Sequence, residues 1–152
     1  MLKPILLVED NPNDLELSLA ALAKSGLAND VVVTRDGAEA RDYLYATGAF
    51  ADRAPGLPAV VLLDLKLPKV DGLELLSMIR NTPGTERLPV VILTSSREEA
   101  DVAAGYQLGS NAYVVKPVEF SAFFKAIQDL GIFWAVLNEP PPTFRGNPTN
   151  GQ

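Results

Sequence analysis

Polar residues follow four short hydrophobic stretches of this chain at the point where each stretch ends. The stretches are ILLV, VVLL, VVIL and AYVV, and the residues that follow them are Glu9-Asp10, Asp64, Thr94 and Lys116-Pro117. Because the carboxyl ends of parallel strands lie along one edge of a sheet, we expect these groups to lie close together. Carboxylates, a hydroxyl and an ammonium group at one place predict a phosphoryl-transfer site centred on one carboxylate.

Asp64 is the candidate phosphoacceptor. It follows a hydrophobic stretch typical of a buried central strand, and a carboxylate there can accept a phosphoryl group as a mixed anhydride. A helix cap or an ordinary loop carboxylate is the structural alternative for Asp64 taken alone. The polar groups at the other three strand ends favour the phosphoacceptor.

Glu9 and Asp10 form an acidic pair that would share an edge of the sheet with Asp64. Three carboxylates at one place require a cation, and Mg²⁺ prefers carboxylate and water oxygens. The pair therefore predicts a magnesium site that supports phosphoryl transfer. The alternative is a solvated acidic pair that caps the first helix.

Lys116 is placed after a hydrophobic stretch, where its ammonium could reach the phosphoryl oxygens. Pro117 is a candidate for a cis peptide bond that would aim Lys116. Thr94 offers a hydroxyl to the phosphoryl group, and its presence makes a switching role plausible for Tyr113. The alternatives are a surface ion pair for Lys116 and a half-buried sheet position for Tyr113.

Composition restricts the class of protein. The 152 residues are 47% hydrophobic, which predicts one globular domain, and the net charge of -6 without a basic run argues against a nucleic-acid partner. The chain has no histidine and no cysteine, which excludes disulfides, thiol chemistry and zinc sites built from those residues, so any metal would have oxygen ligands.

No segment resembles a signal peptide or a membrane span, and we expect a cytoplasmic protein with no membrane partner.

The alternation of Val- and Ile-rich stretches with helical patterns predicts an α/β fold. We expect a doubly wound five-stranded parallel sheet with five helices, in the flavodoxin-like strand order 2-1-3-4-5. Expected strands span residues 4–8, 30–33, 59–64, 89–94 and 112–115, and expected helices span 13–24, 37–46, 72–81, 97–108 and 120 towards 137. The stretch 47–58 is expected to be an ordered loop, and the Pro-rich stretch 139–152 an extended or disordered tail after a domain of residues 1–138.

Two local patterns define the surroundings of the site. Capping residues at 11–13 precede a helix whose inward stripe is predicted to consist of Leu15, Leu19, Leu22 and Ala23. The dipeptide Asp71-Gly72 predicts a turn that needs positive φ before the next helix.

With these residues identified, the chain resembles the response-regulator receiver domains of two-component signalling. The resemblance extends from Ile5 to about Leu137, and its motifs occur in the family's order. They are Glu9-Asp10, the segment LLDLKLPKVDG that contains Asp64, Thr94-Ser95-Ser96, and YVVKP that contains Lys116. The resemblance implies that a partner histidine kinase phosphorylates Asp64 with Mg²⁺ bound.

The resemblance also implies roles for individual residues. Asp10 and Asp64 would ligate Mg²⁺ directly, Glu9 would act mainly through water, and the Lys66 backbone carbonyl would complete the protein ligands. Activation would couple the Thr94 hydroxyl to an inward turn of the aromatic side chain at position 113.

Lys66 and Glu9 depart from the best-known pattern of the family. Glu9 stands where an aspartate is more usual, and Lys66 lies two residues after the acceptor. We predict that the lifetime of the phosphoryl group depends on Lys66, so an unchanged rate of its loss in Lys66→Ala would refute this role. An aspartate-dependent phosphohydrolase would need an acid at position 66, which argues against that enzyme class.

The chain also resembles a narrower group, the small single-domain regulators paired with bacterial phytochrome histidine kinases. This resemblance lies in the loop before Asp64, in the segment DLKLPKVDG and in the residues 130–134 and 138–140 near the carboxyl end. We therefore expect a bacteriophytochrome kinase as partner, no effector domain and output through a protein surface. A run of apolar residues near the end suggests a homodimer through the fourth and fifth elements and the C-terminal helix, or a surface that docks the kinase: Ile132, Phe133, Trp134, Val136 and Leu137. The structural alternative is that these residues simply cover the sheet. The alternative function is a receiver-like interaction module that works without phosphorylation.

Overall fold

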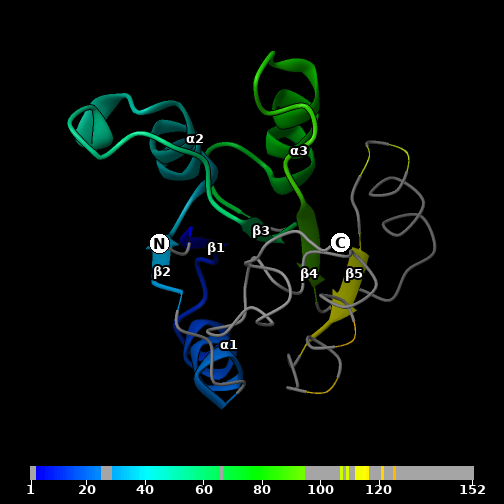
Figure 1. Ribbon diagram of the computed structural model, residues 1–152. Coiled ribbons are helices and arrows are strands. Elements are labelled where there is room, and N and C mark those ends of the chain that lie inside the picture. The colour runs from blue at the N-terminus through cyan, green and yellow to red at the C-terminus, as the bar shows by residue number, and fades with distance from the viewer. Residues whose placement is uncertain are drawn as a thin grey trace, which may run out of the picture.

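The structure is a computed structural model that describes residues 3–24, 29–65, 67–94 and 112–116, together with single residues at 107, 109, 121 and 125 (Figure 1). The described elements are five strands, three α-helices and one short 3-10 helix, η1 (Gly48–Phe50). The expected helix at 97–108, the expected helix after 120 and the tail at 139–152 lie almost wholly outside the described residues. The loop 47–58 is ordered, as expected, and contains η1.

The sheet has the predicted strand order. Its five strands run β2-β1-β3-β4-β5, and every neighbouring pair is parallel. The strands start and end within one residue of the predicted positions. They are β1 (Ile5–Val8), β2 (Val31–Thr34), β3 (Val60–Asp64), β4 (Val90–Thr94) and β5 (Ala112–Val115).

The three described helices cover both faces of the sheet. They are α1 (Pro12–Lys24), α2 (Gly37–Tyr45) and α3 (Gly72–Asn81), and each agrees with its predicted range to within one residue. Figure 1 shows α1 on one side of the sheet and α2 and α3 on the other. None of the helices among the described residues has the length and apolar character that would be needed to cross a membrane.

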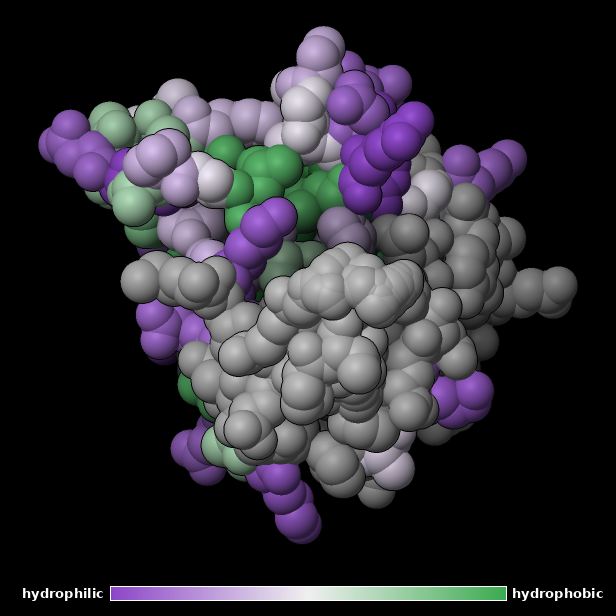
Figure 2. All heavy atoms as spheres, in the orientation of Figure 1, coloured by the Kyte–Doolittle hydropathy of each residue, from purple (hydrophilic) through white to green (hydrophobic). Residues whose placement is uncertain are grey.

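Alternate strand residues form two separate cores. Ile5, Leu7 and Leu62 pack with α1, whereas Leu6 and Leu63 pack with α2 and α3. The side chains of all five are at most 1% exposed. In the space-filling view, hydrophobic surface gathers between α2 and α3 and hydrophilic residues project around it (Figure 2). Both faces of the strands are therefore covered, which explains their continuous apolar sequence.

The inward stripe of α1 is rotated from the predicted one. Leu15 and Leu22 are buried and Leu19 is half-buried, as predicted, but Ala23 is exposed. Ala21 is buried instead, on the opposite edge of the stripe. The prediction for Ala23 was wrong because the buried face of α1 extends through Ser18 and Ala21, on the side of the leucines away from Ala23.

The predicted turn with positive φ at Asp71-Gly72 is also wrong. Asp71 has a φ of -63° and is the N-cap of α3, where its Oδ1 accepts from Leu73 N at 3.0 Å. Positive φ occurs earlier in the loop, at Lys69 with φ 65°. Gly72 is required for space, because a Cβ there would lie 2.4 Å from the Asp64 carbonyl oxygen.

Candidate functional site

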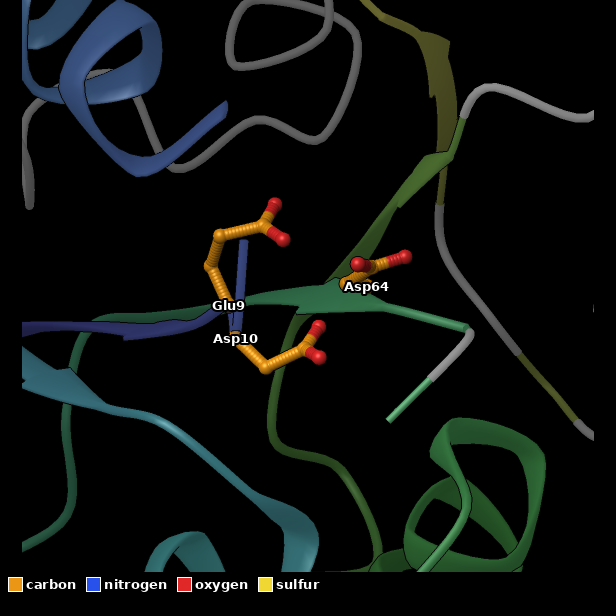
Figure 3. A group of neighbouring side chains, drawn as sticks. All are labelled: Glu9, Asp10 and Asp64. Atoms are coloured by element: carbon orange, nitrogen blue, oxygen red, sulfur yellow. The ribbon is translucent and has the colours of Figure 1, made fainter. Parts of the chain in front are cut away.

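Three carboxylates meet at the carboxyl ends of β1 and β3. Oxygens of Glu9, Asp10 and Asp64 all lie within 4.8 Å of one another. Glu9 is 0% exposed and Asp64 is 5% exposed, whereas Asp10 is exposed to solvent. Figure 3 shows the side chains of Glu9 and Asp10 leaving the end of β1 in different directions, with the Asp64 carboxylate beside them.

Strand register brings these residues together. Val8 pairs with Leu63, so the residues that follow them, Glu9 and Asp64, start at the same level of the sheet. The pairing of Thr94 in β4 with the last residue of β5 brings Lys116 to the same edge. Glu9, Asp64 and Lys116 each lie two residues after a strand position that packs on the α1 side, namely Leu7, Leu62 and Val114.

Lys116 is the cation of the cluster. Its Nζ lies 2.6 Å from Glu9 Oε1, 3.0 Å from Asp14 Oδ2 and 3.1 Å from Asp64 Oδ2. The Lys116 side chain is only 6% exposed. The alternative interpretation of Lys116 as a member of a surface ion pair is therefore wrong, because the ammonium is enclosed by three carboxylates.

Burial and charge act together on the ionisable groups. Burial raises the pKa of Glu9 to about 7; Lys116 partly offsets that rise, and the neighbouring Asp64 adds to it. For Lys116, burial by itself lowers the pKa of the ammonium. Its contacts with Glu9, Asp14 and Asp64 outweigh burial, so the pKa of Lys116 is raised overall.

A neutral amide caps the first helix at its N-terminus. Asn11 Oδ1 accepts from Asn13 N at 2.9 Å and from Asp14 N at 3.0 Å. Glu9 Oε2 accepts from the Asn11 backbone N at 3.2 Å, which fixes the carboxylate at the start of this turn. The helix-capping alternative for the acidic pair is thus wrong, since the Asn11 side chain performs that role.

The cluster can hold a divalent cation. Each of its three close carboxylates offers an oxygen, and oxygen ligands suit hard cations. One ammonium does not balance the negative charge of these carboxylates together with Asp14. The charge and the chemistry of the donor atoms therefore fit a divalent cation among Glu9, Asp10 and Asp64.

The other predicted site residues are described in part. Thr94 ends β4 and Tyr113 lies within β5, so both belong to the strands that carry the site, but their side chains lie outside the description. Lys66 and Pro117 lie outside the described residues. Asp14 was missed as a site residue, although its position in the first turn of the helix after Glu9-Asp10 was a usable signal.

Comparison with known proteins gives the family. The profile of the response regulator receiver domain matches residues 5–128. The chain belongs to this family. The expected domain boundary at residue 138 lies beyond the matched segment and stays a prediction.

Similar proteins include phytochrome response regulators. Response regulator Rcp1 of Synechocystis sp. is 40% identical over 132 residues, covering 87% of this chain and 88% of Rcp1. The bacteriophytochrome response regulator AtBRR is 66% identical, with a TM-score of 0.84, covering 91% of this chain and 99% of AtBRR.

Two further solved structures show similar response regulators in particular states. The Mn²⁺-bound form of Rcp1 has 38% identity and a TM-score of 0.72, and the match covers 91% of this chain and 99% of that chain. The phosphorylated cyanobacterial phytochrome response regulator RcpA has 41% identity and a TM-score of 0.73, with 88% and 94% coverage.

Proposed function

We propose that this receiver domain accepts a phosphoryl group on Asp64 from a partner histidine kinase. The observation that carries the proposal is the enclosure of the nearly buried Asp64 by two further carboxylates and by Lys116. Such an arrangement costs stability unless it serves a charged ligand, because like charges are held together in a buried place. A divalent cation supplies positive charge that the cluster lacks, and it would also balance the negative charge that a phosphoryl group brings.

The proposed reaction forms one bond and breaks one bond. An Asp64 carboxylate oxygen attacks the phosphorus of the kinase phosphohistidine, and the phosphorus–nitrogen bond breaks. The imidazole leaves with the bonding electron pair and takes a proton from water. The product is an acyl phosphate on Asp64, which a later attack of water on phosphorus returns to carboxylate and inorganic phosphate. The chain thus catalyses only its own phosphoryl acceptance and loss.

Lys116 and Thr94 would bind the transferred group. The Lys116 ammonium already lies 3.1 Å from Asp64 Oδ2, so it can follow the phosphoryl oxygens as negative charge arrives there. The Thr94 hydroxyl would donate to a phosphoryl oxygen, and Tyr113 on the neighbouring strand would turn inward in response. Val91 of β4 pairs with Ala112 of β5, so the two strands are neighbours in the sheet. A change at the end of β4 therefore occurs beside β5.

Mg²⁺ is the proposed cofactor. Asp10 and Asp64 would ligate it directly, Glu9 would act mainly through water, and the Lys66 carbonyl would complete the protein ligands. When bound, the cation neutralises charge on the phosphoryl group during transfer. The Mn²⁺-bound form of Rcp1 supports a divalent cation in a related regulator.

A bacteriophytochrome histidine kinase is the proposed partner. The names of AtBRR and RcpA associate those relatives with phytochromes, and RcpA has been solved in a phosphorylated form. Output would pass through a protein surface, with a homodimer formed through the fourth and fifth elements and the C-terminal helix.

Phosphotransfer from a purified bacteriophytochrome kinase tests the proposal. The kinase is first labelled with radioactive ATP and freed of nucleotide, and the chain is then added with Mg²⁺. We expect the label to move to the parent chain and to Asp52→Asn, a control that removes an exposed aspartate outside the cluster. Asp64→Asn should accept none. Equal labelling of Asp64→Asn would refute Asp64 as the acceptor.

A further inference from the structure

Asp14 is a carboxylate of the cluster that the proposed chemistry does not use. It comes from α1, and its Oδ2 lies 3.0 Å from Lys116 Nζ, in a contact between residues 102 positions apart in the sequence. The Asp14 side chain is 33% exposed, whereas Lys116 is 6% exposed. Asp14 lies outside the group of close carboxylates that could hold the cation, so its described partner is the lysine.

Lys116 donates hydrogen bonds to Asp14 Oδ2 and Asp64 Oδ2, and its Nζ also forms an ion pair with Glu9 Oε1 at 2.6 Å. An ammonium has three N–H groups, and three carboxylates lie within 3.1 Å of Nζ. A phosphoryl group on Asp64 needs at least one of these donors. Any contact that Lys116 keeps with Asp14 is therefore unavailable to the phosphoryl oxygens.

We propose that Asp14 is a positioning residue that holds the Lys116 ammonium towards α1 and opposes its transfer to the phosphoryl group. This inference rests on the proposed function of Asp64. In the unphosphorylated chain, Asp14 stabilises Lys116 where it is. When a phosphoryl group arrives, Asp14 competes for the same ammonium and repels the added negative charge.

Removing the charge at position 14 should raise the affinity of the protein for a phosphoryl group. Asparagine keeps the size of the side chain and one oxygen acceptor, but it removes the charge. Asp14→Asn should therefore bind an anionic phosphoryl mimic more tightly than the parent chain. Because Asp14 is partly exposed, we expect an increase in affinity of about threefold to tenfold.

Beryllofluoride binding in saturating Mg²⁺ measures this effect, with the bound species followed by fluorine NMR. The matched control is Glu16→Gln, which makes the same charge change at an exposed position of the same helix. Asp14→Glu restores the charge at position 14. Thermal unfolding of each variant, recorded beside the affinity, reports any loss of stability from the first turn of α1.

The expected result is tighter binding by Asp14→Asn, with parent-like binding by Asp14→Glu and Glu16→Gln. Weaker binding by Asp14→Asn would overturn the proposal, because it would mean that Asp14 preorganises Lys116 for the phosphoryl group. Equal shifts in Asp14→Asn and Glu16→Gln would also overturn it, since net charge alone would then explain both. If the parent chain binds beryllofluoride and Asp64→Asn does not, these failures concern Asp14 only; if the parent chain binds none, the proposed function fails and this inference fails with it.

Discussion

Glu9→Gln in the cation-free protein should reveal how costly the buried acidic cluster is. Glu9 is 0% exposed and its pKa is raised from 4.5 to about 7 by burial, against the opposing effect of Lys116. The folded protein therefore binds a proton at Glu9 that the unfolded chain releases at lower pH. Stability consequently falls as the pH rises from 4.5 to about 7, and it stays low above that range.

Glutamine removes this pH-dependent cost. A rise of the pKa from 4.5 to about 7 corresponds to at most about 3 kcal/mol of unfolding free energy at pH 8. We expect Glu9→Gln to be more stable than the parent by up to that amount at pH 8 in EDTA. The difference should shrink as the pH is lowered and disappear below pH 4.5, where the parent carboxyl becomes protonated in both states.

Urea unfolding across this pH range is the assay, with Glu16→Gln as the control for net charge. Glu16 is exposed, so its replacement should change stability by less than about 0.5 kcal/mol at every pH. A constant difference between Glu9→Gln and the parent across the range would refute the reasoning. A parent chain that is more stable than Glu9→Gln at pH 8 would also refute it. The contact with Lys116 would then stabilise the Glu9 carboxylate by more than burial destabilises it.

Three further predictions test the framework that holds the site, and the second includes an exposed control position. Gly72→Ala would place a methyl group 2.4 Å from the carbonyl oxygen of Asp64, so we expect a loss of more than about 2 kcal/mol in urea unfolding together with slower phosphoryl acceptance. Ile79→Ala should cost about 2–5 kcal/mol because this side chain is 0% exposed, while Leu17→Ala, at a position 50% exposed, should cost less than about 0.5 kcal/mol; equal losses would contradict the described core. Arg53→Met removes four hydrogen bonds to backbone carbonyl oxygens and should speed hydrogen exchange in the loop 54–57, whereas unchanged exchange would show that the arginine does not hold the loop.

The fold and the ends of the strands could be predicted because their signals are local. Stretches such as VVLL are apolar without interruption, as strands covered on both faces must be, and a polar residue marks the point where each of the four strands that carry the site leaves the core. A parallel sheet then brings these ends to one edge, so Glu9, Asp64 and Lys116 could be grouped before any distance was known.

The contact of Asp14 with Lys116 could not be predicted in the same way. It joins two residues 102 positions apart, and it depends on how α1 is rotated over the sheet. The predicted stripe included Ala23, which is exposed, and omitted Ser18 and Ala21, which are buried. A helix residue outside the leucine stripe therefore received no role, although its side chain reaches the buried lysine.

The role of Gly72 was missed for a different reason. A glycine before a helix can supply positive φ or leave room for a neighbouring backbone, and the sequence does not distinguish the two. Only the position of the Asp64 carbonyl oxygen shows that space is the requirement. The positive φ in this loop belongs to Lys69, a residue type that gives no signal for it.

Asp64 should accept a phosphoryl group only when a divalent cation is bound. The most direct test is the intact mass of the parent chain after incubation with a small acyl-phosphate donor, with Mg²⁺ or with EDTA. We predict the addition of one phosphoryl group with Mg²⁺, none in EDTA and none in Asp64→Asn, while Asp52→Asn behaves as the parent. Addition to Asp64→Asn at the parent rate, or no addition to a parent chain that also fails to bind beryllofluoride, would contradict the account.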